Sequence, residues 1–308
     1  MSTKRQPRNL IEAVRYFADL DVATEFVAKL RWPSGPACPR CGDMAYSYLS
    51  TRRVWKCKGC KKQYSVKVGT ILEDSPLGLD KWLPAIWLIA NSKNGISSHE
   101  LGRALGVTQK SAWFMLHRIR LAMQTGTFEK LDGAVEVDET FIGGRARNMH
   151  KHVRARKITG RGGAGKAIVV GARERGGDVR VAVVADRSSD TLGEFVWDTI
   201  QPGAAVYTDE HGGYSALSGD FAHETVDHAE RYVDGQVHTN GMENFWSLLK
   251  RGLHGTYVSV EPFHLFRYLD ERVFTFNQRE LSDLGRFAAV LSLAAGRRLT
   301  YAELTGHR

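Results

Sequence analysis

Two sets of side chains in this 308-residue sequence have the types and spacing that chemistry requires. The first set holds every cysteine of the chain, in the pairs Cys38–Cys41 and Cys57–Cys60. Two CxxC pairs at this separation suit one tetrahedral Zn²⁺ bound by four thiolates. Disulfide bonds are the alternative, but a cytosolic chain keeps its thiols reduced. The spacing therefore predicts a structural zinc ribbon, since four thiolates leave no open position for a catalytic water.

The second set consists of three carboxylates that lie far apart in the sequence. Asp138 lies in the alternating segment 134–144, and Asp209 ends the apolar part of segment 204–214. Glu243 comes one turn into an amphipathic helix. Negative side chains that converge repel one another strongly unless a cation lies between them. Oxygen ligands in a water-accessible cluster suit Mg²⁺ or Mn²⁺, so we expect these residues to form a divalent-metal site.

The helix that carries Glu243 also allows a structural interpretation. Asn240 followed three residues later by Glu243 is a capping-box pattern, so the glutamate could simply stabilise the helix end. Lys250 lies two turns further along the same face, where it could hold a phosphate. Trp246 belongs to the apolar stripe of the helix and is expected in the core.

The order of elements around the carboxylates predicts the fold. Segment 166–186 is typical of two strands joined by a Gly-Gly hairpin, and segment 190–200 is typical of a helix. Strand, strand, strand, helix, strand and helix is the order of the ribonuclease-H-like α/β fold, a mixed sheet with helices on its faces. In that fold Asp138 lies midway along the first strand and Asp209 at the tip of its neighbour.

Weaker signals lie near the same residues. Alternation predicts that Glu139 and Glu210 point to the opposite sides of their strands from the neighbouring aspartates. His238 precedes the helix of the third carboxylate and is a candidate for direct involvement. Segment 160–167 nearly fits a phosphate loop, but Ala167 stands where a Ser or Thr must bind Mg²⁺, so we expect no nucleotide cofactor.

Residues 96–123 have the pattern of a helix-turn-helix. Ser97 or Ser98 can cap a first short helix, Gly106 can make the turn, and Thr108 can cap a second helix. An ordinary helical hairpin is the alternative. The strongly basic ribbon nearby favours the interpretation as a DNA-binding unit.

Charge is divided unevenly along the chain. The net charge of +9 comes from +11 over residues 1–130 and −2 over residues 131–308, and the segment 145–166 holds eight Lys/Arg and no acid. A basic front joined to an acid-containing body indicates a polyanion-binding module attached to a part that needs carboxylates. The candidate DNA contacts are Arg52, Arg53, Lys61 and Lys62 in the ribbon, Gln109, Lys110 and Arg118 in the second helix, and Arg154, Arg156 and Lys157 in the basic segment.

The stretches CPRCG, WKCKGC, VEVDETFIGG, VYTDEHGGY and HTNGMENFWSLLKR together resemble bacterial insertion-sequence transposases of the DDE type, in the group with an N-terminal zinc ribbon. The resemblance implies a catalytic triad of Asp138, Asp209 and Glu243, accompanied by Lys250. It implies binding of terminal inverted repeats, cleavage that frees a 3′-hydroxyl, and attack of that hydroxyl on target DNA. A non-catalytic DNA-binding regulator and a nuclease or resolvase on the same fold are the alternatives.

These observations together predict the organisation of the chain. No apolar run is long enough to cross a membrane, and the N-terminus lacks the apolar core of a secretion signal. We therefore expect a cytoplasmic, nucleoid-associated bacterial protein that forms a homodimer or larger assembly on double-stranded DNA. The expected parts are a helical segment (1–34), the zinc ribbon (35–70), the helix-turn-helix region (71–130), the ribonuclease-H-like catalytic domain (131–280) and a C-terminal helical extension (281–308).

Overall fold

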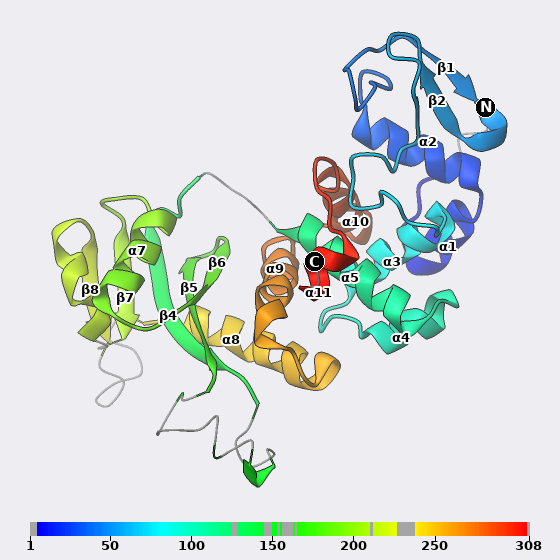
Figure 1. Ribbon diagram of the computed structural model, residues 1–308. Coiled ribbons are helices and arrows are strands. Elements are labelled where there is room, and N and C mark those ends of the chain that lie inside the picture. The colour runs from blue at the N-terminus through cyan, green and yellow to red at the C-terminus, as the bar shows by residue number, and fades with distance from the viewer. Residues whose placement is uncertain are drawn as a thin grey trace. The chain divides into compact units, whose positions relative to one another are not determined.

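A computed structural model describes residues 5–124, 129–144, 150–152, 155, 163, 165–209, 212–226 and 238–306. The chain divides into two compact units. Residues 1–125 and 278–308 form what we call the helical unit, and residues 126–277 form the sheet unit (Figure 1). The C-terminal residues thus return to the unit that contains the N-terminus.

Helices packed around α3 make up most of the helical unit. The side chains of α3 are largely buried, among them Trp82 and Trp87. The helix packs against α1, α2, α5 and α10. Phe287 of α10 lies 5.2 Å from Trp87 and 5.4 Å from Phe17 of α1, measured between ring centroids. The helices are α1 (Leu10–Phe17), α2 (Leu20–Arg31), α3 (Leu79–Asn91), α4 (Ser98–Leu105), α5 (Gln109–Met123), α10 (Asp283–Ser292) and α11 (Tyr301–Thr305).

The helix-turn-helix prediction agrees with α4 and α5. Ser97 caps α4 in a reciprocal capping box with Glu100. Gly106 ends the helix with a φ of 66°, a left-handed conformation that glycine adopts without strain. Thr108 caps α5 by accepting a hydrogen bond from the backbone N–H of Ser111. Local sequence signals therefore fix both ends of this turn.

The ribbon is a small antiparallel sheet within the helical unit. Its strands lie in the order β1-β2-β3, with Tyr48 opposite Trp55 and Trp55 opposite Tyr64. These aromatic side chains share one face because directly paired residues of neighbouring strands point the same way. The elements are β1 (Tyr46–Leu49), the 3₁₀ turn η1 (Ser50–Arg52), β2 (Val54–Cys57) and β3 (Gln63–Tyr64).

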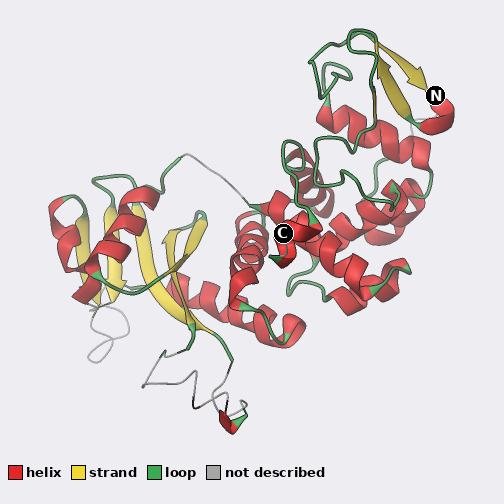
Figure 2. Cartoon of the chain, viewed as in Figure 1, coloured by secondary structure: helices red, strands yellow, loops and turns green. Residues whose placement is uncertain are grey.

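A five-stranded mixed sheet forms the centre of the sheet unit, within the residues described (Figure 2). Its order is β6-β5-β4-β7-β8; β4 is antiparallel to β5 and parallel to β7. This confirms the mixed α/β, ribonuclease-H-like arrangement. The short strand β8 was not predicted. The strands are β4 (Ala134–Ile142), β5 (Ala167–Glu174), β6 (Val179–Val184), β7 (Ala205–Asp209) and β8 (Ala222–Val226).

Two apolar clusters cover the two faces of this sheet. Val135 and Val137 of β4 pack with Val196 of α7 on one face. Val169 of β5 packs with Trp246 of α8 and with α9 on the other. The helical elements of the unit are α7 (Ser189–Thr199), η3 (Gly212–Gly219), α8 (Asn240–Gly252), the π-helical turn η4 (Leu253–Tyr257), η5 (Pro262–His264) and α9 (Leu265–Asn277).

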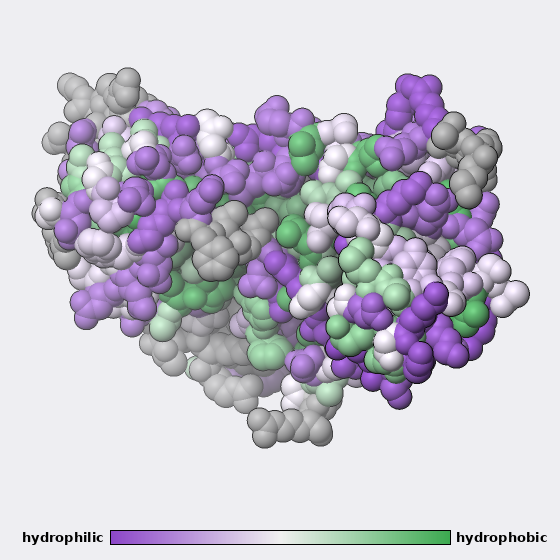
Figure 3. Space-filling model, turned by 90° about the horizontal axis from the view of Figure 1, so that it is seen from above, coloured by the Kyte–Doolittle hydropathy of each residue, from purple (hydrophilic) through white to green (hydrophobic). Residues whose placement is uncertain are grey.

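The surface visible in Figure 3 is mainly hydrophilic, with separate apolar patches. None of the helices in the described part of the chain has the length and apolar character needed to cross a membrane.

Candidate active site

The four cysteines of the ribbon lie in one cluster, with their Sγ atoms all within 4.8 Å of one another. The Sγ atoms of Cys38 and Cys60 are 3.7 Å apart, and those of Cys41 and Cys57 are 3.6 Å apart. Four thiolates about 2.3 Å from a central Zn²⁺ form a tetrahedron with edges of about 3.8 Å. A disulfide would bring two sulfurs to about 2.05 Å. The spacing fits a structural zinc ion.

The register of β4 and β7 brings two of the predicted carboxylates together. Ala134 pairs with Ala205 and Glu136 with Tyr207, an offset that places Asp209 beside Asp138. The carboxylate oxygens of Asp138 and Asp209 lie within 4.8 Å of each other. Both residues are partly exposed, so water and a ligand can reach them.

Glu139 joins the same cluster, which alternation along the strand did not predict. One of its carboxylate oxygens lies within 4.8 Å of those of Asp138 and Asp209. It accepts hydrogen bonds from Arg187 Nη1 (2.9 Å) and Tyr214 Oη (2.8 Å), which come from the α7 side of the sheet. The side chain of Glu139 thus points to the α7 side, as alternation predicts, while one of its oxygens still lies within 4.8 Å of the two aspartates.

The surroundings of Asp138 favour binding of a cation. Its Oδ1 accepts a hydrogen bond from the backbone N–H of Glu139 (2.8 Å), and its Oδ2 accepts one from Trp246 Nε1 (3.0 Å). Burial, followed by the charges of Glu139 and Asp209, raises the pKa of Asp138 to about 7. Burial and these repulsions mean that Asp138 holds a proton below about pH 7 unless a metal ion replaces it. The residues present thus fit a divalent cation.

Trp246 links the helix α8 directly to this cluster. It is 4% exposed and lies in the predicted core, but its indole N–H also bonds Asp138, a role that the apolar pattern did not reveal. Gly171 of β5 pairs with Asp138 across the strands and makes room for the indole. A Cβ at Gly171 would lie 2.8 Å from Trp246 Cη2 and 2.5 Å from Met242 Cε. A glycine inside a strand was the sequence signal for this close approach.

The structure does not form the Asn240–Glu243 capping box that is the alternative interpretation of Glu243. Helix α8 begins at Asn240, with Thr239 as N-cap and without a side-chain cap hydrogen bond. The side chain of Glu243 is exposed, and the residue lies three positions before Trp246. Residues at this spacing are neighbours on a helix, so Glu243 lies beside the residue of α8 that bonds Asp138. Its carboxylate is not part of the 4.8 Å group formed by the described residues Asp138, Glu139 and Asp209.

Glu136 anchors the start of α8, a role that the sequence did not indicate. Its side chain is 2% exposed and accepts a hydrogen bond from the backbone N–H of Met242 (3.0 Å). It also pairs with Arg175 Nε (3.1 Å) and lies 3.3 Å from His238 Nδ1. Arg175 Nη2 in turn donates to the carbonyl oxygen of His238 (3.0 Å). A buried carboxylate at a helix N-terminus interacts favourably with the helix dipole, so this network fixes the position of α8. His238 contacts this network rather than the carboxylate cluster.

The candidate DNA contacts differ in their exposure. Arg53 pairs with Asp21 (2.6 Å between Nε and Oδ1) and is partly buried. Arg118 does not point outward as predicted: it is 3% exposed, its guanidinium lies over the rings of Trp82 and Phe114, and Nη2 donates to the carbonyl of Glu73. Its long aliphatic stem and planar head fill a gap beside α3, so it belongs to the core. The exposed candidates are Arg52, Lys61, Lys62, Gln109 and Lys110. Arg154, Arg156, Lys157 and Glu210 lie outside the described residues, as do residues 160–162 and 164 of segment 160–167.

Comparisons with known proteins agree with this geometry. Residues 130–277 match the family described as the ISXO2-like transposase domain, and residues 20–63 match the transposase zinc-ribbon domain. The chain is 28% identical over 253 residues to an uncharacterized protein in transposable element ISH50 of Halobacterium salinarum, covering 78% of this chain and 85% of that protein. It is 30% identical over 104 residues to an uncharacterized transposase-like protein of Haemophilus influenzae, covering 33% of this chain and 84% of that protein.

Proposed function

Because the chain belongs to the insertion-sequence transposases with an N-terminal zinc ribbon, we propose that it cleaves DNA at the ends of an insertion sequence and joins the freed ends to target DNA. The observation that carries this proposal is the pair Asp138 and Asp209, whose carboxylate oxygens meet within 4.8 Å at the end of β7. Such a pair suits Mg²⁺ or Mn²⁺.

In this proposal Asp138, Asp209 and Glu243 hold the metal. When bound, divalent ions activate the attacking oxygen and stabilise the departing one. Trp246 Nε1 and the backbone N–H of Glu139 keep the two oxygens of Asp138 in place. Glu243 is supported as the third ligand by its position one turn before Trp246 on α8.

Two other residues act beside the ligands. Lys250 lies seven residues after Glu243 on α8, a spacing that keeps it on the same helix face, and holds a DNA phosphate. Glu139 is held by Arg187 and Tyr214 and adds negative charge next to Asp138. Its charge strengthens the binding of a divalent cation.

The zinc ribbon and the helix-turn-helix bind the terminal inverted repeats in this account. The exposed cations of the ribbon contact phosphates, and α5 presents Gln109 and Lys110 to the duplex. Two element ends must be held together for joining, so a homodimer or larger assembly is proposed. Neither ATP nor a covalent protein–DNA intermediate is required, and the substrate places the protein in the cytoplasm with the nucleoid.

A cleavage and joining assay tests the proposal. The substrate is a labelled DNA fragment that carries the sequences flanking the gene, incubated with Mg²⁺ and the full chain. We expect wild type to yield cut ends and joined products, and Asp209→Ala to lose both by about 10³-fold, because metal ions supply several kcal/mol of transition-state stabilisation. Asp198→Ala, which removes an exposed carboxylate of α7, is the matched control and should retain activity.

The outcomes separate the alternatives. Cleavage without joined products would indicate a nuclease or resolvase. Specific binding to the flanking sequences without any metal-dependent cleavage would indicate a DNA-binding regulator. Full activity of the Asp209→Ala protein would refute the proposed site.

A further inference from the structure

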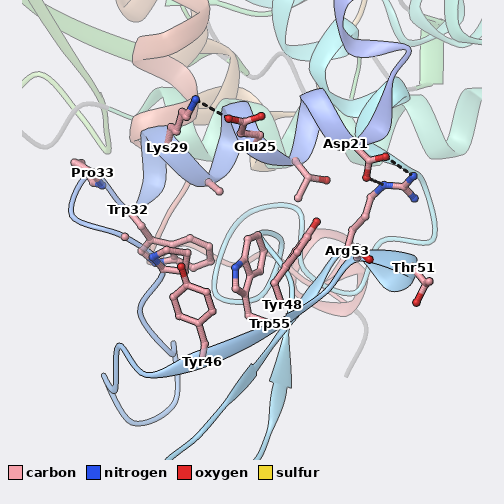
Figure 4. A pocket seen from close by; sticks show the side chains of 15 residues that line it. Asp21, Glu25, Lys29, Trp32, Pro33, Tyr46, Tyr48, Thr51, Arg53 and Trp55 are labelled. Atoms are coloured by element: carbon pink, nitrogen blue, oxygen red, sulfur yellow. Dashed lines mark hydrogen bonds and ion pairs between the residues drawn. The ribbon is translucent and has the colours of Figure 1, made fainter. Parts of the chain in front are cut away.

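A cavity in the helical unit lies between α2 and the ribbon and has no part in the proposed active site. Its volume is about 970 Å³, and its walls include the aromatic side chains of Trp32, Tyr46, Tyr48 and Trp55 (Figure 4). Sites for small organic ligands have volumes of roughly 300–1,000 Å³. The space is large enough for a flat aromatic molecule and part of a chain attached to it.

Short side chains on α2 keep the cavity open. Thr24 and Ala28 line it from positions one helical turn apart, so they share the helix face that looks toward the ribbon. A leucine or phenylalanine at either position would fill the space against the tyrosines.

The aromatic walls offer faces that the protein itself does not cover. Tyr46 and Tyr48 project from the edge strand β1 and are 37% and 43% exposed. Trp55 is 6% exposed and packs against Tyr48 and Trp32, with its ring centroid 5.0 Å from that of Tyr48 and 5.4 Å from that of Trp32. A buried ring therefore holds the accessible ring of Tyr48, and Tyr46 lies two residues away on the same face of β1.

The charged residues of the lining are paired with one another. Arg53 binds Asp21 (2.6 Å), and Lys29 binds Glu25 (2.7 Å), as Figure 4 shows. The walls present no unbalanced charge to a ligand inside the cavity. An uncharged aromatic group suits these walls better than a phosphate or a carboxylate does.

The ribbon that forms one wall of the cavity, in contrast, is strongly basic as a whole. Residues 44–72 contain seven Lys/Arg and no Asp/Glu. A ligand with an uncharged flat group and a polyanionic chain is complementary to the aromatic walls of the cavity and to the basic ribbon. We propose that the cavity holds an unstacked nucleobase of single-stranded DNA, stacked on Tyr46 and Tyr48, while the ribbon's cations hold its phosphates.

This inference takes DNA as the partner from the proposed function but requires no catalysis. A base inside a duplex has both faces covered by its neighbours, so only an unpaired or extruded nucleotide can enter. Protein peptides with aromatic side chains are the competing occupants. They lack the regular phosphates that the basic ribbon would neutralise.

Binding of short oligonucleotides to the full chain tests the inference. The probes are a fluorescent single strand that contains 2-aminopurine, the same strand with abasic sugars, and the matching duplex, all without added Mg²⁺. We expect the intact strand to bind about tenfold more tightly than the abasic strand, which is within the range that base–aromatic stacking supplies. The 2-aminopurine emission should be quenched on binding.

Variants of the cavity residues test whether the difference in binding between the intact and abasic strands arises in the cavity. Tyr46→Ala and Tyr48→Ala should each weaken binding of the intact strand about tenfold and leave the abasic strand unaffected. Tyr48→Phe keeps the ring and should bind like wild type. Ser47→Ala, on the opposite face of β1, is the matched control. Zinc content measured on every variant verifies that the ribbon remains folded.

Equal binding of the intact and abasic strands would overturn the inference, as would a tyrosine effect that is the same for both strands. The inference would also be overturned if Tyr48→Ala weakened binding of the duplex as much as it weakens binding of the intact single strand. Because no cleavage is measured, failure here leaves the transposase assay untouched. Conversely, if the transposase assay shows neither cleavage nor joining, the difference in binding between the intact and abasic strands can still be measured.

Discussion

The proton that Asp138 holds in the absence of metal makes the stability of the sheet unit depend on pH. Burial and the neighbouring carboxylates raise its pKa from the ordinary 3.8 to about 7. A carboxyl with a raised pKa in the folded state contributes stability that is complete below pH 3.8 and is lost as pH rises through about 7. The metal-free protein should therefore be less stable at pH 8 than at pH 5.5.

The size of this loss follows from the pKa values. Between about pH 5.5 and 7 the folded form holds about one proton more than the unfolded form, and each pH unit then costs about 1.4 kcal/mol. The upper limit over this window is about 2 kcal/mol. Partial access of water to the cluster reduces it, so we expect about 1–2 kcal/mol.

Amide hydrogen exchange of β4 in the full chain measures this loss at each pH, after correction for intrinsic exchange rates. Divalent ions are simply left out, because a chelator would also remove the structural zinc. Asp138→Asn is the control: it loses one of two hydrogen bonds at every pH but has no proton to release. Added Mg²⁺ should bind wild type about tenfold more tightly per pH unit up to about 7, since it displaces that proton.

The same slope of stability against pH for wild type and Asp138→Asn would refute this reasoning. It would mean that Asp138 is ionised throughout the window and that Glu139 and Asp209 do not repel it. The close grouping of the three carboxylates would then need another explanation.

Three further predictions concern folding and the support of the site. Cys38→Ser should lose the bound zinc and unfold the ribbon, as metal analysis and limited proteolysis would show, because zinc binding provides much of the folding energy of so small a unit. Gly171→Ala should destabilise the sheet unit by about 1–3 kcal/mol in urea unfolding and weaken Mg²⁺ binding, since its Cβ would push Met242 and α8 away from the sheet. Glu136→Ala should cost about 3 kcal/mol by the same measurement, because it leaves Arg175 without its carboxylate and α8 without its anchor, whereas Glu136→Gln should retain part of that stability through the bond to Met242.

Short-range patterns predicted several parts of this protein correctly. The caps Ser97 and Thr108 and the turn at Gly106 agree with the sequence because capping depends on residues three or four positions apart. The spacing of the cysteines likewise predicted one cluster. Alternation in residues 134–144 placed Val135 and Asp138 on opposite faces of a strand, as the structure has them.

Contacts between distant segments were predicted less well. Arg118 was expected at the surface, because its position in the helix does not show that the ring of Trp82 and the carbonyl of Glu73 lie beside it. The role of Glu136 depends on where α8 begins, about one hundred residues further along the chain. Neither contact can be predicted from the local periodicity of the sequence.

By itself, the sequence determined which chemistries are available: thiolates paired for zinc, carboxylates on strands and a helix, and a basic front. The tertiary structure alone decided which of these groups meet. The register of β4 on β7 sets Asp138 beside Asp209, and an oxygen of Glu139 lies within 4.8 Å of both. Close packing on Gly171 brings Trp246 to the same carboxylate. The physical reason is that residue types follow from local order, whereas distances between strands and helices follow from how whole elements pack.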